Sequence, residues 1–212
     1  MKKKPSSRLR FPEDEKKHSW LPLLLDAYSI VDQGVASAVS REKRRRRAEL
    51  ACRRGCDSCC RFQKDIPVYP LELVGIYWYV IEKMAGPARS EVREKLAAFR
   101  HEDACPFLVG SACSIHPLRP VGCRLFNVFG TSCEEGEDPF YTRRDDVLTP
   151  PPEITERAFR VMLPFYGYRD EKAQDAVIRN RLLHAEAQPI HSLTWQELGL
   201  RMDEYDGRKE KP

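Results

Sequence analysis

Eight cysteines are the residues of this chain best suited to chemistry, and four of them lie within nine residues. This first group consists of Cys52, Cys56, Cys59 and Cys60. Successive residues of an α-helix turn by about 100°, so these positions fall within an arc of roughly 100° and one helical face could present all four sulfurs. Thiolates that point the same way repel one another unless a cation lies among them. The spacing therefore predicts metal binding by soft sulfur ligands.

The remaining four cysteines follow at longer intervals, in a segment rich in proline and glycine. They are Cys105, Cys113, Cys123 and Cys133. This segment shows little helical periodicity, which predicts loops and tight turns with few repeating backbone hydrogen bonds. We expect a metal ion to tie these loops to the first cysteine group. Pro120 and Gly122 favour a turn that would direct Cys123 toward the metal.

Disulfide bonds are the main alternative explanation for so many cysteines, because small secreted domains are often cross-linked. The sequence does not look secreted, since its basic start is followed only by a short apolar stretch, residues 21–25, that a proline interrupts. A chain of 212 residues can also bury a core without cross-links. We therefore expect a cytoplasmic protein with reduced thiols. Buried free thiols or redox sensing form a third interpretation.

The elements that must position these cysteines are predicted to be helices. Apolar residues recur three or four positions apart through much of the chain, which is the pattern of amphipathic α-helices. The predicted helices span residues 20–50, 71–84, 90–100, 153–165, 170–186 and 194–202. The predicted fold class is mainly α, a small helical domain with a loop-rich, cysteine-bearing, metal-binding segment.

Composition divides the chain into four parts. Residues 1–18 are basic and polar and are expected to be disordered. Residues 19–135 form the predicted cysteine-cluster metal-binding domain, with its core at residues 50–126. Residues 136–202 are expected to form a helical C-terminal extension that packs on this domain, and residues 203–212 a polar tail.

The charge balance gives no argument for an anionic partner, since 36 basic and 32 acidic residues leave a net charge of only +4. The basic run at residues 41–47 lies where a helix is predicted to end, and positive charge suits the helix dipole there. It contains no aromatic residue for base stacking, so nucleic acid is not an expected partner. No run of about 18 apolar residues is present, so no membrane partner is expected either.

Two blocks of sequence carry a more specific pattern. The first is Cys52-Arg-Arg-Gly-Cys56-Asp-Ser-Cys59-Cys60-Arg61, followed by Ile66-Pro67-Val68 and a predicted helix that contains Glu72. The second is Cys105-Pro-Phe-Leu108, then Cys113-Ser-Ile115, then Arg119-Pro120-Val-Gly-Cys123-Arg124. These blocks resemble the YkgJ-like cysteine-cluster family of zinc- or iron-chelating proteins, which is also associated with flagellin N-methylase-like sequences. The chain differs in having three residues, not two, between its first two cysteines, and His116 where the family usually has tyrosine.

The resemblance implies that cysteines from both blocks bind a metal. The expected ligands are Cys52, Cys56, Cys59, Cys60, Cys105, Cys113 and Cys123. The residues expected to surround them are Arg61, Arg119, Pro120 and Arg124. The arginines would offset the net charge of about −2 that a four-thiolate zinc site or [4Fe–4S] cluster carries.

Histidines offer only one further candidate ligand. His116 follows Cys113 by three residues and is an alternative ligand. The others show no ligand spacing and are expected to be ordinary surface residues: His18, His101, His184 and His191.

Zinc and iron both fit this set of thiols. The gaps of seven and nine residues in the second group resemble cluster ligation more than a zinc ribbon, which favours iron–sulfur. The leading hypothesis is a metal-binding protein that holds zinc or iron, including iron in a [4Fe–4S] cluster. The resemblance implies a cluster-dependent enzyme as the alternative, such as a flagellin lysine N-methylase-like methyltransferase, although the sequence shows no catalytic constellation. A second alternative is a nucleic-acid-associated metal or redox sensor.

Overall fold

The computed structural model of this chain describes residues 8–209, which are mainly helical, and this confirms the predicted fold class. The α-helices of this range are, in chain order, α1 (Pro12–Lys17), α2 (Trp20–Arg46), α3 (Ser58–Phe62), α4 (Pro70–Trp78), α5 (Pro87–Ala98), α6 (Val121–Leu125), α7 (Pro139–Thr142), α8 (Pro152–Met162), α9 (Glu171–Arg179) and α10 (Trp195–Lys209).

Short elements connect these helices. A π-helix (Tyr79–Lys83) continues α4, and the 3-10 helices are His116–Leu118, Arg144–Asp146, Leu163–Tyr166, Leu182–Glu186 and Ile190–Ser192. The strands are β1 (Pro67–Val68), β2 (Leu108–Val109), β3 (Ala112–Cys113) and β4 (Gln188–Pro189). β2 pairs with β3 as a local hairpin, whereas β1 pairs antiparallel with β4 from the far end of the chain.

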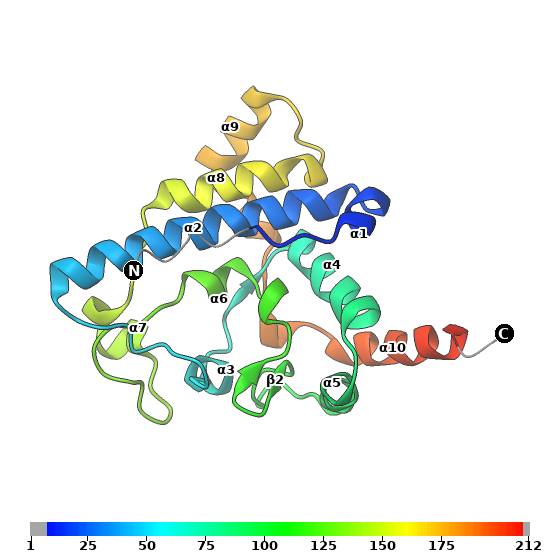
Figure 1. Cartoon of the computed structure of the whole chain (residues 1–212). Helices are drawn as coiled ribbons and strands as arrows, with labels where there is room; N and C mark the ends of the chain where they lie inside the picture. Colours follow the sequence, from blue (N-terminus) through cyan, green and yellow to red (C-terminus); the bar gives the residue numbers. More distant parts are fainter. Residues whose placement is uncertain (1–7, 210–212) are drawn as a thin grey trace.

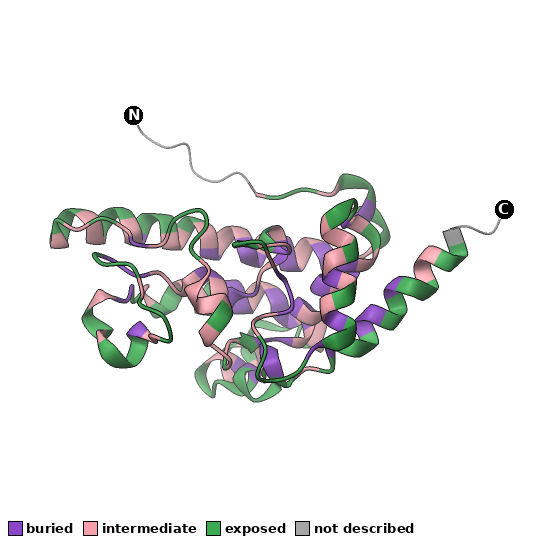
Figure 2. Ribbon diagram, turned by 90° about the horizontal axis from the view of Figure 1, so that it is seen from below, coloured by how far each residue is buried: buried purple, intermediate pink, exposed green. Residues whose placement is uncertain are grey.

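The long helix α2 packs along α8 to form the upper layer seen in Figure 1. Its apolar positions recur at helical spacing, and Leu24 and Val31 are buried in the same core as Phe159 of α8. Gly34 lets the two helices approach, because a Cβ at this position would lie only 2.5 Å from Cγ2 of Ile154. The basic C-terminal end of α2 extends beyond this core, and Figure 2 shows it without buried residues.

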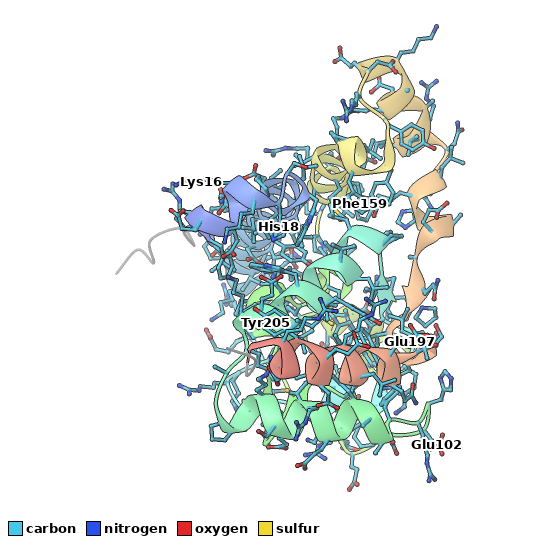
Figure 3. All side chains as sticks on the ribbon, turned by 90° about the vertical axis from the view of Figure 1, so that its right-hand side faces the viewer. Lys16, His18, Glu102, Phe159, Glu197 and Tyr205 are labelled. Carbon is cyan, nitrogen blue, oxygen red and sulfur yellow. The ribbon has the colours of Figure 1, made fainter. Side chains whose placement is uncertain are left out.

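A second core lies between α5 and α10, which Figure 3 shows side by side. Leu96 of α5 and Leu198 of α10 are fully buried there, and the ring of Phe107 meets the ring of Trp195 edge-on at 4.8 Å. The run formed by α4 and its π-helix belongs to both cores, with Leu71 in the first and Val80 in the second. α4 and its π-helix therefore connect the two hydrophobic cores.

Helices are present in two segments where the sequence predicts none, the N-terminal segment 1–18 and the polar tail 203–212. Within the segment 1–18, the helix α1 lies against α2, and residues 1–7 are outside the described range. Within the predicted tail, α10 continues to Lys209, and residues 210–212 are again outside the described range. Arg89 pairs with Asp206 at 2.8 Å and Arg93 with Asp203 at 3.2 Å, so ion pairs with α5 contribute to holding this polar part of α10. Such pairs leave no local sequence pattern.

None of the helices in residues 8–209 is both long enough and apolar enough to cross a lipid bilayer.

The contact at Gly34 gives a first prediction. Gly34→Ala should lower the free energy of unfolding by about 1–3 kcal/mol, because the added methyl group forces Ile154 to move and this exceeds the gain in helix propensity. The matched control is Gly207→Ala in α10, where nothing lies within 4 Å of the new Cβ. It should raise the free energy of unfolding by up to about 1 kcal/mol. Urea denaturation measures both, and stabilisation by both substitutions would contradict the close packing of α2 on α8.

Candidate metal centre

The first cysteine group does not lie on one helical face, so that prediction is wrong. α2 ends before Arg47, which adopts the left-handed conformation with φ of 52°. The chain then runs as a non-helical loop to α3 and turns at Gly55, whose φ is 85°. Positive φ angles interrupt an α-helix, and glycine adopts them at little cost. Only the last two of the four cysteines, Cys59 and Cys60, are therefore on a helix.

The second cysteine group meets the first in space. Cys105 precedes β2, Cys113 lies in β3 and Cys123 lies in α6. The backbone N–H of Cys105 donates to the carbonyl oxygen of Cys60 at 2.7 Å, which fixes the loop before β2 against α3. Figure 1 shows α3, β2 and α6 in the same lower central part of the molecule. The structure therefore brings together two segments that are distant in sequence.

Five thiols form one group, the inner thiols: Cys59, Cys60, Cys105, Cys113 and Cys123. All of them except Cys113 line a cavity of about 30 Å³. Cys113 is near enough to act electrostatically on Cys105 and Cys123. None of the eight cysteines, all within residues 8–209, forms a disulfide bond. The thiols available to a metal ion are therefore concentrated around one small cavity.

Burial disfavours the ionised form of the inner thiols. It raises the pKa of Cys105 and of Cys123 well above the usual value of a thiol, and neighbouring thiols raise both further. For Cys59, the hydrogen bond with the Cys60 thiol raises the pKa most, followed by burial. A bound cation would reverse this balance because it stabilises thiolates. Metal binding at the cavity must therefore release protons.

The other three cysteines form the outer thiols, Cys52, Cys56 and Cys133. Burial raises the pKa of Cys52 to about 11, and its sulfur accepts a hydrogen bond from the N–H of Val128 at 3.3 Å. The thiols of Cys56, Cys59 and Cys133 also act on Cys52, so the outer group borders the inner one. Cys133, which is not among the predicted ligands, reaches this group because its segment folds back on the loop after α2.

The side chains are not yet in a binding geometry. Among residues 8–209, no three histidine, cysteine, aspartate or glutamate side chains are arranged to hold one metal ion. The donors nevertheless fit zinc or iron, because the inner thiols are soft ligands, free of disulfides and gathered at one cavity.

Arg119 is the arginine that faces the inner thiols. Burial raises the pKa of Cys113, and the charge of Arg119 partly opposes that effect. Arg119 also lowers the pKa of Cys59 and Cys123, against the larger effects that raise them. Its Nε atom is buried and has no hydrogen-bond partner. Arg119 is therefore placed where its charge favours the ionised form of these thiols, and its predicted role beside a metal stays a prediction.

Arg124 makes structural contacts that the sequence does not predict. It is buried and forms a salt bridge with Asp32 at 2.7 Å. Its other donors bind the carbonyl oxygens of Pro117, at 2.6 Å, and Arg119, at 2.8 Å. Its guanidinium lies 3.9 Å from the ring centroid of Tyr28. Arg124 therefore holds the loop that carries Arg119 against α2, and its charge also lowers the pKa of Cys113, although less than that of Arg119 does.

The remaining residues expected around the metal are Arg61 and Pro120. Arg61 is exposed and pairs with Asp57 at 2.7 Å, and Pro120 directly precedes α6. Gly122 is helical and does not form the turn that sequence predicts for it. Its role is close packing, because a Cβ at this position would lie 3.1 Å from Cδ of Pro67. The missing side chain lets α6, and with it Cys123, lie directly against β1.

Glu72 also holds α6 in place, through a hydrogen bond to its first turn. This fully buried carboxylate accepts the backbone N–H of Tyr69 at 3.0 Å and that of Val121 at 2.7 Å. Burial raises its pKa to about 7, and the two hydrogen bonds act in the opposite direction. Glu72 therefore satisfies backbone donors at the starts of both α4 and α6 with one side chain. In sequence this residue stands out only through the resemblance noted above.

One of the five histidines, His191, is not where the sequence places it, whereas His101 and His184 are exposed as predicted. His116, the alternative ligand, is exposed on a groove beside α2 that it shares with Asp32. His191, expected at the surface, is only 3% exposed and lines the cavity of the inner thiols, so that prediction is wrong. Its position in sequence, far beyond the last cysteine, gives no signal of this proximity.

Residues 51–149 match the model of a protein family, CxxCxxCC, that carries the description "Putative zinc- or iron-chelating domain". This segment is similar to the CxxCxxCC family. It includes all eight cysteines and extends past the predicted core to Cys133. No match was found among curated proteins, and none among solved structures. The matched segment ends before His191, so the cavity is lined by residues from inside and outside it.

The anchoring role of Glu72 gives a second prediction. Glu72→Gln should lower the free energy of unfolding by about 1–3 kcal/mol, because the amide NH₂ group would face one of the two backbone N–H donors and leave it unpaired. Urea denaturation of the metal-free protein measures the change. The matched control is Glu82→Gln at an exposed position nearby, which should stay within about 0.5 kcal/mol. Equal stability of the two variants would show that Glu72 does not anchor α6.

Proposed function

We propose that this protein binds one zinc or iron ion through thiolates of the inner group. The observation that carries the proposal is the cavity of about 30 Å³ at which four thiols from three separate segments meet. Thiols that are buried, free of disulfides and next to the charge of Arg119 have the chemistry of a metal site and not of a cross-linked scaffold. The description of the CxxCxxCC family supports the same conclusion.

The single ion is proposed from the number of thiols at the cavity. Four thiols line it, and a closed structural zinc site takes four protein ligands. This choice departs from the iron–sulfur preference that the cysteine gaps suggest. A four-thiolate cluster uses the same number of cysteines, so metal and sulfide analysis distinguishes the two.

The ion would act as a structural link. α3, the loop before β2 and α6 are short elements, and the ion would join all three through thiolates. Metal sites closed by protein ligands serve structure, whereas catalytic sites keep an open position. If four protein ligands close around the ion, the site has no open position for a substrate, which would favour a binding function over the methyltransferase alternative.

Part of the basic run at residues 41–47 is paired within the chain. Arg45 and Arg46 both pair with Glu42, at 2.7 Å and 2.8 Å, and Lys43 pairs with Glu49. Charges that are already paired are less available to phosphates, so this run gives the nucleic-acid alternative less support than its sequence suggests.

Removal of an inner thiol tests the proposal. Cys123→Ser should lower the zinc or iron content of anaerobically purified protein by at least about tenfold, since even the loss of a residue that only supports a ligand costs that much. The matched control, Cys133→Ser in the outer group, should keep the metal content of the unchanged protein. Elemental analysis and an absorption spectrum measure content and identity. Unchanged metal content in Cys123→Ser would remove the inner thiols as ligands, and iron with inorganic sulfide would contradict the single ion.

Proton release gives a further prediction. Because burial raises the pKa of Cys105 and Cys123, these thiols carry protons at neutral pH in the metal-free protein. Metal affinity should therefore rise with pH, by about tenfold per pH unit for each proton released below the thiol pKa. Calorimetric titration in buffers of different ionisation enthalpy counts these protons, and we expect more than two per ion. Fewer than one proton per ion would exclude binding by buried thiols.

A further inference from the structure

His191 is a buried imidazole with no assigned role. Its side chain is 3% exposed, and neither Nδ1 nor Nε2 has a hydrogen-bond partner in the described residues. A neutral imidazole has one N–H donor and one acceptor nitrogen, and each buried polar atom left unpaired destabilises the fold. An apolar side chain could fill this position without two unpaired nitrogens, so packing alone does not explain a histidine here. A partner that binds one of the nitrogens explains it more simply.

The ring lies at the cavity of the inner thiols. His191 lines this cavity together with Cys59, Cys60, Cys105 and Cys123. The cavity is therefore lined by three cysteine-bearing segments and by a histidine from a fourth, distant one. A metal ion bound by the thiols would supply a partner to a His191 nitrogen that turns toward it.

The backbone around His191 is held firmly in place. The N–H of Ile190 donates to the carbonyl of Ile66 at 2.8 Å, and Nε1 of Trp195 donates to the carbonyl of Ile190 at 2.7 Å. The pairing of β1 with β4 continues the first contact toward Val68. These bonds attach the segment of His191 to the chain that leaves α3, so the imidazole is positioned before any ion binds.

The second nitrogen also has candidate partners. The carbonyl groups of Lys64 and Asp103 lie near the ring, although neither makes a hydrogen bond of good geometry. A histidine that binds a metal through one nitrogen commonly donates the other N–H to a carbonyl or carboxylate. If one ring nitrogen donates to one of these carbonyls, the other is left to bind the metal.

We propose that His191 is a nitrogen ligand of the metal ion held by the inner thiols. The inference rests on the proposed function and adds the C-terminal part of the chain to its site. Zinc and iron both accept mixed sulfur and nitrogen ligands. Three thiolates and one neutral imidazole around a divalent ion leave a net charge of −1, whereas four thiolates leave −2. The single positive charge of Arg119 matches the first of these.

Cobalt(II) titration of the full chain tests the ligand directly. The unchanged protein should show a sulfur-to-cobalt charge-transfer band, and the matched control His116→Leu, at an exposed histidine, should show the same band and affinity. His191→Leu should keep a sulfur band but lose at least about tenfold in affinity for cobalt and zinc. His191→Cys should restore affinity with a stronger sulfur band. X-ray absorption of the zinc-loaded protein should fit nitrogen at about 2.0–2.1 Å beside sulfur at about 2.3 Å, with the nitrogen lost in both variants.

Stability of the metal-free protein separates this role from packing. His191→Leu should leave the free energy of unfolding of metal-free protein unchanged or raise it, because it removes two unpaired nitrogens. A variant that loses stability without metal, and binds zinc as tightly as the unchanged protein, would overturn the inference. So would a zinc shell of sulfur alone in the unchanged protein. Either of these two results would leave the sulfur band, and with it the proposed function, intact. Absence of the sulfur band in the unchanged protein would instead overturn the proposed function and this inference together.

Discussion

The hydrogen bonds of one buried carboxylate determine where the inner thiols can be. Glu72 accepts N–H groups at the starts of α4 and α6, and α4 is the element that both hydrophobic cores share. Burial disfavours its charge, but two backbone donors compensate for the lost water. Since α6 is too short to be stable by itself, its position follows from this anchor and from the close packing of Gly122 on β1. Cys123 reaches the cavity for that reason.

Two arginines of one loop act on the inner thiols to different extents. Arg124 is buried and uses its donors on Asp32 and on carbonyl oxygens, so it fixes the loop to α2. Its charge also lowers the pKa of Cys113, but the charge of Arg119 does so more strongly. Arg119 acts in the same direction on Cys59 and Cys123, and its buried Nε has no hydrogen-bond partner. Arg119 is therefore the arginine best placed to favour thiolates.

The C-terminal part of the chain completes the surroundings of the cavity. β4 pairs with β1, and the 3-10 helix that follows β4 carries His191 to the thiols. α10 then packs on α5 and buries Trp195 against Phe107, two residues beyond Cys105. The segment that matches the family and those after it thus share one core around the cysteines, so the site is not confined to the former.

The sequence by itself determined the donors and the helical class of this protein. Cysteine type and number, the periodic apolar positions of α2 and the pattern that includes Arg119 are local properties, which spacing reports directly. Only the tertiary structure decided which donors meet. The first cysteines do not share one helical face, because the residue after α2 is left-handed and ends the helix. Cys133 lies with the outer thiols. His191 lines the cavity, although the sequence predicts it at the surface. These outcomes depend on contacts between segments far apart in the chain, such as the pairing of β1 with β4. Such contacts produce no periodic pattern of residues in the sequence, so they cannot be predicted from it.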